Sequence, residues 1–410
     1  MRKNNIMSLF SFLWLLYQIF IARVPSLDAI RKKWLLATKI GQLYALRADF
    51  IGINRANILT QLYEKNFDTT KTDTPYSFEE SFREQFESID DVALSEASIG
   101  KVYSARWKWR DMVIKIIKSD FREKFITDVV RLKKYFRFII FFYPKLARVA
   151  DPIGTLEDLE RMTLSELALR NEIKGASVLK KTLDNHRDFI SKTVSHELTF
   201  PDFITELSSE KILVSEKLTG KSFRELLDTG TLPYPVLIDF FFQHVFCMLL
   251  DGYFHEDIHS GNIFFQDNKI YLLDNGSIGF ASEKLRHGLT SFFDNLTHDR
   301  IKSSASSLIL MAENAEQNKH NFTQYEKDFC KLYEGFSSKT LKELSLTQQM
   351  MASIKMAVHA GYTFERGMYP IIKSFIYLDG MARTCKPDTK LMEDVRPLIE
   401  KFSAYVKTIA

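Results

Sequence analysis

The segment HEDIHSGN occupies residues 255–262, and the segment LLDNGSIG follows from Leu272. Together they supply a carboxylate at Asp257, an amide at Asn262 and a second carboxylate at Asp274, which ends an apolar run. Phosphoryl transfer requires a protein mainly to position groups and to neutralise charge. Asp257 is suited to stand beside an attacking nucleophile, whereas Asn262 and Asp274 carry the hard oxygen atoms that Mg²⁺ prefers. These residues therefore predict a site for a metal-bound polyphosphate.

The order H-x-D-x-x-x-x-N followed by D-x-G is the pattern of kinase catalytic and metal-binding loops. Kinases also need a lysine and a glutamate from earlier in the chain, and this sequence offers both. Lys115, in VIKI, is expected to bind the α- and β-phosphates of a nucleotide. Glu172, in LRNEIKG, is expected to pair with Lys115, although Glu166 lies nearby on the same expected helix. The backbone around Glu216 and Leu218 is expected to form the hinge that holds an adenine ring.

The segment that should cover the phosphates has no G-x-G-x-x-G motif and reads ALSEASIGKV at residues 93–102. A loop of small residues at Ala97, Ser98 and Gly100 still offers backbone N–H groups to a phosphate. Glu96 is unfavourable there, because its carboxylate would repel phosphate oxygens. We expect a phosphate loop with altered chemistry.

A small sheet and a hairpin must position these residues. Residues 26–66 read as helical, and residues 102–117 read as a strand, a turn and a second strand. A long helical section is expected over 120–182, and two short strands around a turn are expected over 207–220. The remainder is expected to be mostly helical, interrupted by a β-hairpin at 262–274 that turns at Asp267-Asn268.

Composition excludes several classes of protein. The net charge of +4 is spread along the 410 residues and does not indicate a nucleic-acid surface. The three cysteines, Cys247, Cys330 and Cys385, are far apart, which argues against a disulfide framework and a structural zinc site and favours a reducing compartment.

The N-terminus carries an apolar run of 17 residues, from Ile6 to Ala22. Its length is at the short edge of what spans a bilayer. A membrane anchor or interfacial helix, a buried N-terminal helix and a cleaved signal peptide all remain open, although IARVPS is a poor cleavage site. A second apolar segment, FRFIIFFYP near residue 140, is interpreted as a core helix that Pro144 ends.

Several segments resemble the UbiB-type atypical kinases, also called the AarF or ADCK family. SEASIGKVYSA resembles their alanine-rich loop, HEDIHSGN their HADPHPGN loop, SELALRNE their ELDxxxE segment, and KIGQ, from Lys39, their K-x-G-Q helix. Two C-terminal helical segments, GYTFERGMYPIIKSFIYLDGMAR and KLMEDVRPLIEKF, extend the resemblance over about residues 30–405.

The resemblance implies an α+β, bilobal protein-kinase-like fold with a helical N-terminal extension over the active site. It implies that Lys39 and Gln42 share one helix face and point into the nucleotide cleft. The domains expected are an apolar anchor or interfacial helix at 1–25, the extension at 26–80, an N-lobe at 81–220 and a helical C-lobe at 221–410.

The family further implies a kinase or ATPase that uses ATP and Mg²⁺ and supports ubiquinone or isoprenoid-lipid metabolism at a membrane. A lipid or quinone precursor, or proteins of lipid metabolism, would be its partners, and its kinase domain would face a reducing compartment such as the bacterial cytoplasm or an organelle matrix.

The departures from the family pattern leave Lys115, Asp257, Asn262 and Asp274 in place and predict a nucleotide-binding, potentially active protein. Two of them, Glu96 and Ala168, motivate an alternative, a nucleotide-binding pseudokinase scaffold. A small-molecule phosphotransferase of the aminoglycoside or choline kinase type shares the catalytic motifs but gives no reason for the KIGQ helix. The departures are Glu96, Lys101, Ala168, Asn275, Ile258 and Ser260.

Overall fold

The computed structural model describes residues 9–33, 35–45, 51, 54–55, 58–59, 62, 76–96, 100–117, 121–144 and 152–409. The expected phosphate-loop residues Ala97 and Ser98 therefore lie outside the described residues. The chain divides into two compact units, which we call unit 1 (Met1–Ile173 and Pro201–Lys217) and unit 2 (Lys174–Phe200 and Leu218–Ala410). The change of unit after Lys217 is close to the domain boundary expected at residue 220, whereas residues 174–200 lie in unit 2.

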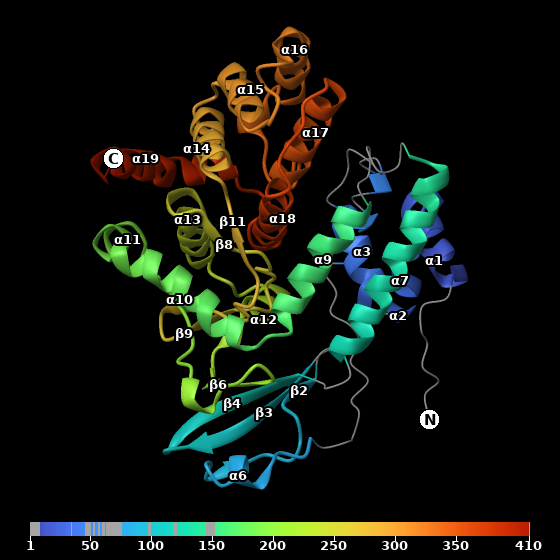
Figure 1. Cartoon of the computed structure of the whole chain (residues 1–410). Helices are drawn as coiled ribbons and strands as arrows, with labels where there is room; N and C mark the ends of the chain where they lie inside the picture. Colours follow the sequence, from blue (N-terminus) through green and yellow to red (C-terminus); the bar gives the residue numbers. More distant parts are fainter. Residues whose placement is uncertain are drawn as a thin grey trace. The chain divides into compact units, whose positions relative to one another are not determined.

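Unit 1 begins with helices whose apolar faces pack on one another. Phe12 in the first helix is fully buried, and its ring stacks on Tyr135 and meets the edge of Phe136. Helices α3, α7 and α9 contact each other (Figure 1). The helical elements of this unit are α1 (Leu9–Leu16), a π-helical turn (Tyr17–Ile21), α2 (Leu27–Lys33), α3 (Leu35–Ala45), α6 (Glu80–Arg83), α7 (Phe121–Phe142), α9 (Pro152–Glu166) and the first turn of α10 (Arg170–Asn185).

Five strands of the described part of unit 1 form an antiparallel sheet in the order β1-β3-β4-β6, with β2 paired to β3. The expected hairpin at 102–117 is present, and Lys108 and Trp109 make its tight turn with positive φ angles. The strands are β1 (Ser88–Ile89), β2 (Ser95–Glu96), β3 (Gly100–Trp107), β4 (Arg110–Ile117) and β6 (Ile212–Glu216).

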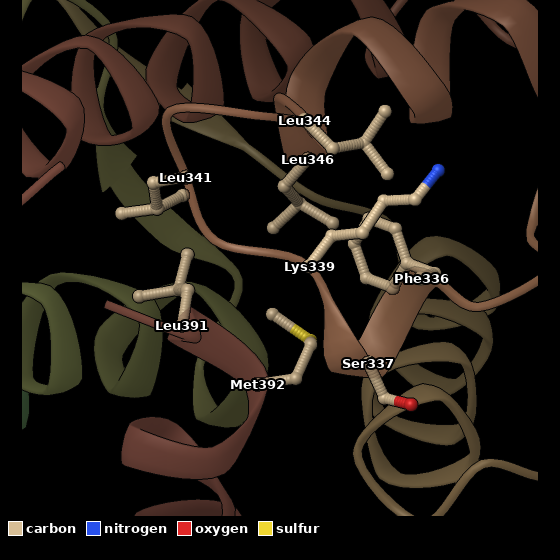
Figure 2. A pocket seen from close by; sticks show the side chains of 8 residues that line it. All are labelled: Phe336, Ser337, Lys339, Leu341, Leu344, Leu346, Leu391 and Met392. Carbon is tan, nitrogen blue, oxygen red and sulfur yellow. The ribbon is translucent and has the colours of Figure 1, made fainter. Parts of the chain in front are cut away.

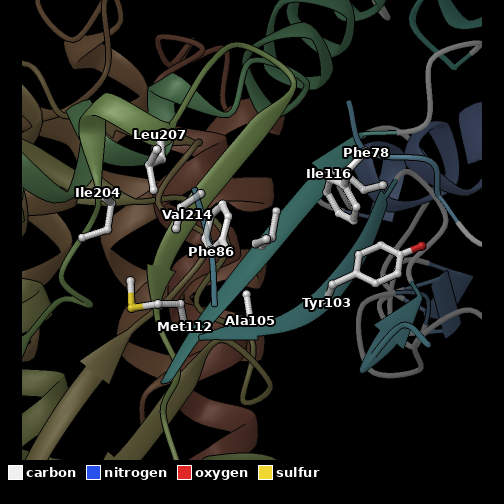
Figure 3. Packing of buried hydrophobic residues seen from close by; sticks show 10 residues of the cluster. Phe78, Phe86, Tyr103, Ala105, Met112, Ile116, Ile204, Leu207 and Val214 are labelled. Carbon is white, nitrogen blue, oxygen red and sulfur yellow. The ribbon is translucent and has the colours of Figure 1, made fainter. Parts of the chain in front are cut away.

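Successive side chains of β4 face opposite sides of the sheet, and each side is covered by its own apolar cluster. Met112, Ile114 and Ile116 are buried on one face, in a cluster with Tyr103 and Val214 (Figure 3). Because successive side chains of a strand point to opposite faces, Lys115 points to the other face. A second apolar cluster covers that face, and its buried members are Ile117, Leu167, Leu169 and Leu213.

The expectation of two strands around a turn at 207–220 was wrong in part, because only β6 is a strand there. Ser208 and Ser209 explain the difference. The Ser209 hydroxyl accepts hydrogen bonds from the backbone N–H groups of Lys211 and Ile212, and the Ser208 hydroxyl accepts one from Val214. Serine side chains that bind the local backbone favour a turn over a strand ladder, so β6 pairs with β4 instead.

The segment near residue 140 is helical, as expected, and α7 ends before Pro144. The prediction that it lies in the core was wrong. Phe138, Phe141, Phe142 and Tyr143 are each at least 65% exposed. An apolar run alone does not reveal whether another element covers it, because burial depends on tertiary packing.

The N-terminal helix is apolar on two sides. Phe12, Leu15 and Ile19 are fully buried, whereas Phe10 and Ile21 are mostly exposed. Among the described residues, no helix combines the length and the apolar character needed to cross a bilayer.

Unit 2 places its strands around the segments that carry the candidate site. Strand β8 ends at His255, and the β9–β10 hairpin turns at Asp267 and Asn268 with positive φ angles, as expected. The strands form a sheet in the order β5-β10-β9-β7 and a separate β11-β8 pair. Their bounds are β5 (Leu198–Thr199), β7 (Lys221–Ser222), β8 (Tyr253–His255), β9 (Ile263–Gln266), β10 (Lys269–Leu272) and β11 (Ile278–Phe280).

The rest of unit 2 is helical, with α14 to α17 packed in succession and α13 central to the fold (Figure 1). Helix α13 is mostly apolar and largely buried, and its polar residues Asp239 and Gln243 bind the backbone of residues 195–198. The helices are α10 from Lys174, α11 (Arg187–Thr193), α12 (Phe223–Asp228), α13 (Tyr234–Leu250), α14 (Glu283–Thr297), α15 (Ile301–Leu310), α16 (Phe322–Leu332), α17 (Leu346–His359), α18 (Met368–Cys385) and α19 (Leu391–Ile409).

Candidate active site

In unit 1 the expected ion pair is present. Lys115 Nζ lies 2.5 Å from Glu172 Oε1. Lys115 lies in β4, and Glu172 lies in the first turn of α10. The start of α10 is held in place because the Leu169 N–H donates to the Glu210 carbonyl. The Glu172 side chain is only 5% exposed. A buried carboxylate needs a partner of opposite charge, and Lys115 provides it.

Of the three residues expected to offer N–H groups to a phosphate, only Gly100 is described, and it has a structural reason to be glycine. It begins β3 opposite Ile117, and a Cβ atom there would lie 2.5 Å from the Ile116 carbonyl oxygen. Glycine thus allows β4 to approach closely, whether or not a phosphate binds.

The expected hinge residues fall on either side of the change of unit, with Glu216 in unit 1 and Leu218 in unit 2. The Glu216 N–H donates to the Asp202 carbonyl, and the Lys217 N–H donates to the Asp111 carbonyl. Burial raises the pKa of the Glu216 carboxyl, and the nearby Asp202 raises it further. Both N–H groups are thus already bound within unit 1, and the adenine-binding role stays a prediction.

The KIGQ segment lies on α3, where its glycine and its glutamine meet the same residue. A Cβ atom on Gly41 would lie 2.6 Å from the Leu62 side chain, and Gln42 Nε2 donates to the Leu62 carbonyl over 3.0 Å. Lys39 is half-buried on the same helix. The motif therefore packs the N-terminal helices together, and the expected reach of Lys39 and Gln42 toward a nucleotide stays a prediction.

In unit 2 a histidine joins the two halves of the catalytic pattern. The Asp257 N–H donates to His255 Nδ1 over 3.0 Å. Since Nδ1 accepts, the ring proton is on Nε2, which lies 2.9 Å from the Asp274 carbonyl oxygen. His255 is fully buried, and burial lowers the pKa of its ring, in keeping with a neutral imidazole. The catalytic and metal-binding segments are thus fixed to each other by one side chain.

The β9–β10 hairpin sets the positions of the expected metal-binding residues. Asn262 immediately precedes β9, Asp274 follows β10, and the Leu273 N–H donates to the Asn262 carbonyl at the base of the hairpin. Asn262 Nδ2 donates to the Asp257 carbonyl over 3.0 Å. Asp274 has a φ of 57°, in the left-handed region, so the chain turns sharply where β10 ends.

These residues fit a magnesium ion in their chemistry. Because the Asn262 amide nitrogen donates to the Asp257 carbonyl, its side-chain oxygen is the atom that would bind a cation, and Asp274 would supply a carboxylate. An amide oxygen and a carboxylate are hard ligands, and Mg²⁺ completes its shell with water and phosphate oxygens.

Two residues of α18 contact Asp257 and were not predicted from the sequence. Lys373 Nζ lies 3.0 Å from Asp257 Oδ1, and the Tyr377 hydroxyl donates to the same oxygen over 2.8 Å. They are one helical turn apart, so both side chains extend from one face of α18. The Lys373 side chain is only 11% exposed. The available signal was a single lysine inside the apolar run MYPIIKSFIYL, because a buried lysine requires a partner.

The segment after Asp274 is closely packed. Asn275, which departs from the family pattern, is fully buried, and its Nδ2 donates to the Leu272 carbonyl. A Cβ atom on Gly175 of α10 would lie 2.0 Å from the Asn275 carbonyl oxygen. The backbone that carries Asp274 therefore lies directly against a helix.

Known proteins resemble this chain over most of its length. The ABC1 atypical kinase-like domain matches residues 74–308. The chain is 26% identical over 388 residues to the probable protein kinase UbiB of Vibrio cholerae serotype O1 (strain M66-2), which covers 89% of this chain and 68% of that protein. The probable protein kinase UbiB of Aliivibrio fischeri (strain MJ11) is 26% identical over 387 residues, with the same coverage.

Among solved structures, the complex of Rv3197 with erythromycin from Mycobacterium tuberculosis has a TM-score of 0.46 and 16% identity, covering 75% of this chain and 79% of that one. That TM-score is too low to support a comparison. The family match covers more than half of the chain and confirms the expected α+β kinase-like fold and the resemblance to UbiB proteins. With Lys115–Glu172 in unit 1 and the Asp257–Asn262–Asp274 set in unit 2, the chain belongs to the ABC1 atypical kinase-like family.

Proposed function

We propose that this protein binds ATP with Mg²⁺ and acts as a UbiB-type atypical kinase or ATPase. The observation that carries the proposal is the network in unit 2 in which His255 binds both Asp257 and the Asp274 carbonyl. This network brings a candidate base and the oxygen ligands for a metal into one hydrogen-bonded set.

Each residue has a defined task in this proposal. Lys115 neutralises charge on the α- and β-phosphates, and the buried Glu172 orients the ammonium group. Asp257 accepts a hydrogen bond from the attacking hydroxyl or water and orients it for in-line attack. Asn262 and Asp274 hold Mg²⁺, which supplies charge neutralisation on the phosphates when bound.

Phosphate release by the purified protein tests this proposal. We expect Asp274→Asn and Lys115→Arg to lower the rate by about a hundredfold or more, because each removes a group that neutralises or holds transition-state charge. Lys390→Arg is a matched control, since Lys390 is only partly buried and pairs with Glu393 at the surface. Equal rates for the wild type and both site variants would overturn the catalytic proposal.

One observation favours the alternative of a nucleotide-binding pseudokinase scaffold. Asp257 Oδ1 already contacts both Lys373 and Tyr377, which competes with its use as a base. A thermal-shift titration with ATP and Mg²⁺ separates the two functions, because the scaffold raises the melting temperature without releasing phosphate.

We propose that the protein works at a membrane in a reducing compartment, on a lipid or quinone precursor or with proteins of lipid metabolism. Its UbiB relatives and its three free cysteine thiols support this setting. The exposed aromatic end of α7, which we define as Phe138, Phe141, Phe142 and Tyr143, supports contact with a membrane surface. Mass spectrometry of lipids that co-purify with the full-length protein tests the ligand class.

A further inference from the structure

Unit 2 contains an apolar cavity of about 110 Å³ that the proposed chemistry does not use. Two helices supply stripes of apolar side chains to its lining. From α13 come Ile238, Phe242, Val245 and Leu249, and from α19 come Val395, Leu398, Ile399 and Phe402. The spacing of three or four residues in both stripes places each set on one helix face.

The cavity has a rigid aromatic floor. Phe246, Phe293, Phe375 and Phe402 line it and are each at most 7% exposed. The rings of Phe246 and Phe402 meet edge to face at 5.7 Å, and those of Phe293 and Phe375 lie 5.1 Å apart. Rings that pack on one another hold the floor in place.

The rim of the cavity is partly exposed. Ile238, Val245, Leu249, Leu398 and Ile399 all line the cavity and are neither fully buried nor fully exposed. A ligand can therefore enter from solvent and leave part of itself outside.

The lining has no polar group available for a ligand. Its two polar residues are Thr290, whose hydroxyl donates to the Arg286 carbonyl over 2.8 Å, and Asp379. The Asp379 carboxylate accepts hydrogen bonds from the Ser345 hydroxyl and the Leu346 N–H. A polar ligand would lose its water and gain no hydrogen bond in return, so the lining selects hydrocarbon.

The deep end of the cavity adjoins a second, smaller void. Leu346, Leu391 and Met392 line both, and Phe336, Ser337, Lys339, Leu341 and Leu344 complete the lining of the smaller void (Figure 2). Of these three shared residues, Met392 is the most flexible, because an unbranched thioether changes rotamer easily. A movement of Met392 would thus connect the cavity with the smaller void.

We propose that this cavity binds the terminal part of the hydrocarbon chain of an amphiphile, whose head group remains outside the rim. The size supports this class of ligand. An engineered apolar cavity of roughly 150 Å³ accepts benzene, so this one accommodates a chain end but not a whole lipid. The proposal concerns unit 2 alone and does not depend on nucleotide turnover.

Fluorescence of cis-parinaric acid, a polyene fatty acid that emits when its chain is in apolar surroundings, measures the binding, with linear alkanols as competitors. We expect saturable binding at one site. Val245→Trp fills the cavity and should weaken binding about tenfold or more, since burial of chain surface is lost. Leu310→Trp is the matched control, because Leu310 is exposed on α15 and does not line the cavity.

A second variant keeps the proposal testable should Val245→Trp fail to fold. Leu249→Ala enlarges the rim, so the best-binding alkanol should become longer than for the wild type. Absence of saturable binding by the wild type overturns the proposal. So does unchanged affinity in a folded Val245→Trp protein, or an unchanged chain-length preference in Leu249→Ala.

Discussion

Asp257 shows how a single residue acquires its role from partners that are distant in sequence. Its motif predicts a base, but its carboxylate is held by Lys373 and Tyr377, more than a hundred residues downstream. A cation 3.0 Å from the carboxylate holds that group in one orientation. Lys373 is therefore a positioning residue of the proposed reaction.

Replacing Lys373 by methionine keeps the length and apolar stem of the side chain and removes its charge. We expect phosphate release to fall about tenfold or more, because Asp257 loses the partner that orients it. Lys373→Arg should restore part of the rate, since it restores the charge. The measurement is steady-state phosphate release by folded protein at saturating ATP and Mg²⁺, and a wild-type rate in Lys373→Met would exclude the role.

At the scale of elements, α7 carries two kinds of residue on its exposed side. Phe138 and Phe141 follow Lys134 and Arg137 by one helical turn. Within the described part of the chain, neither Lys134 nor Arg137 has an ion pair, and both are exposed. Basic residues beside exposed aromatic rings are typical of helices that bind anionic membrane surfaces.

We expect the protein to co-sediment with vesicles of phosphatidylcholine and phosphatidylglycerol. Replacing Phe138, Phe141 and Phe142 by serine should lower the partition coefficient about tenfold, since the variant has less apolar surface to bury. Phe280→Ser is the control, because Phe280 is exposed but lies on β11 in unit 2. The membrane proposal for α7 fails if the triple variant and the control bind equally.

At the scale of the whole molecule, unit 2 buries histidines that must stay neutral. Burial lowers the pKa of His244 to about 3, and it also lowers the pKa values of His255 and His259. Within the described residues, His244 Nε2 has no hydrogen-bond partner. Below the ordinary histidine pKa of 6.5, the unfolded chain takes up a proton that folded His244 does not. The contribution of neutral His244 to the free energy of unfolding is therefore present in full above pH 6.5. It is lost progressively as the pH falls below that value.

His244→Phe should reduce this acid sensitivity, and the new ring would stack on Phe240 as the imidazole does. Between pH 6.5 and pH 5.5, the variant should lose about 1 kcal/mol less unfolding free energy than the wild type, because a histidine with an ordinary pKa of 6.5 is already half protonated at the upper pH. Urea unfolding at both pH values measures the difference. His287→Gln, at an exposed histidine, is the control, and an equal pH dependence in wild type and His244→Phe would contradict the assignment.

The sequence by itself determined the local features of this protein. The two hairpins and the turn at Asp267-Asn268 follow from short-range patterns. The motifs indicated Lys115 and a glutamate partner, and the tertiary structure selected Glu172 as that partner. The family also follows from the sequence, because its motifs occur in order.

The tertiary structure alone decided which apolar and charged residues are covered. The aromatic end of α7 is exposed, Lys373 contacts Asp257, and α13 and α19 line one cavity. None of these three features was predicted from the sequence. The physical reason is that burial and ion pairing depend on segments far apart in the chain. Periodicity and propensity describe only a residue's neighbours along the sequence.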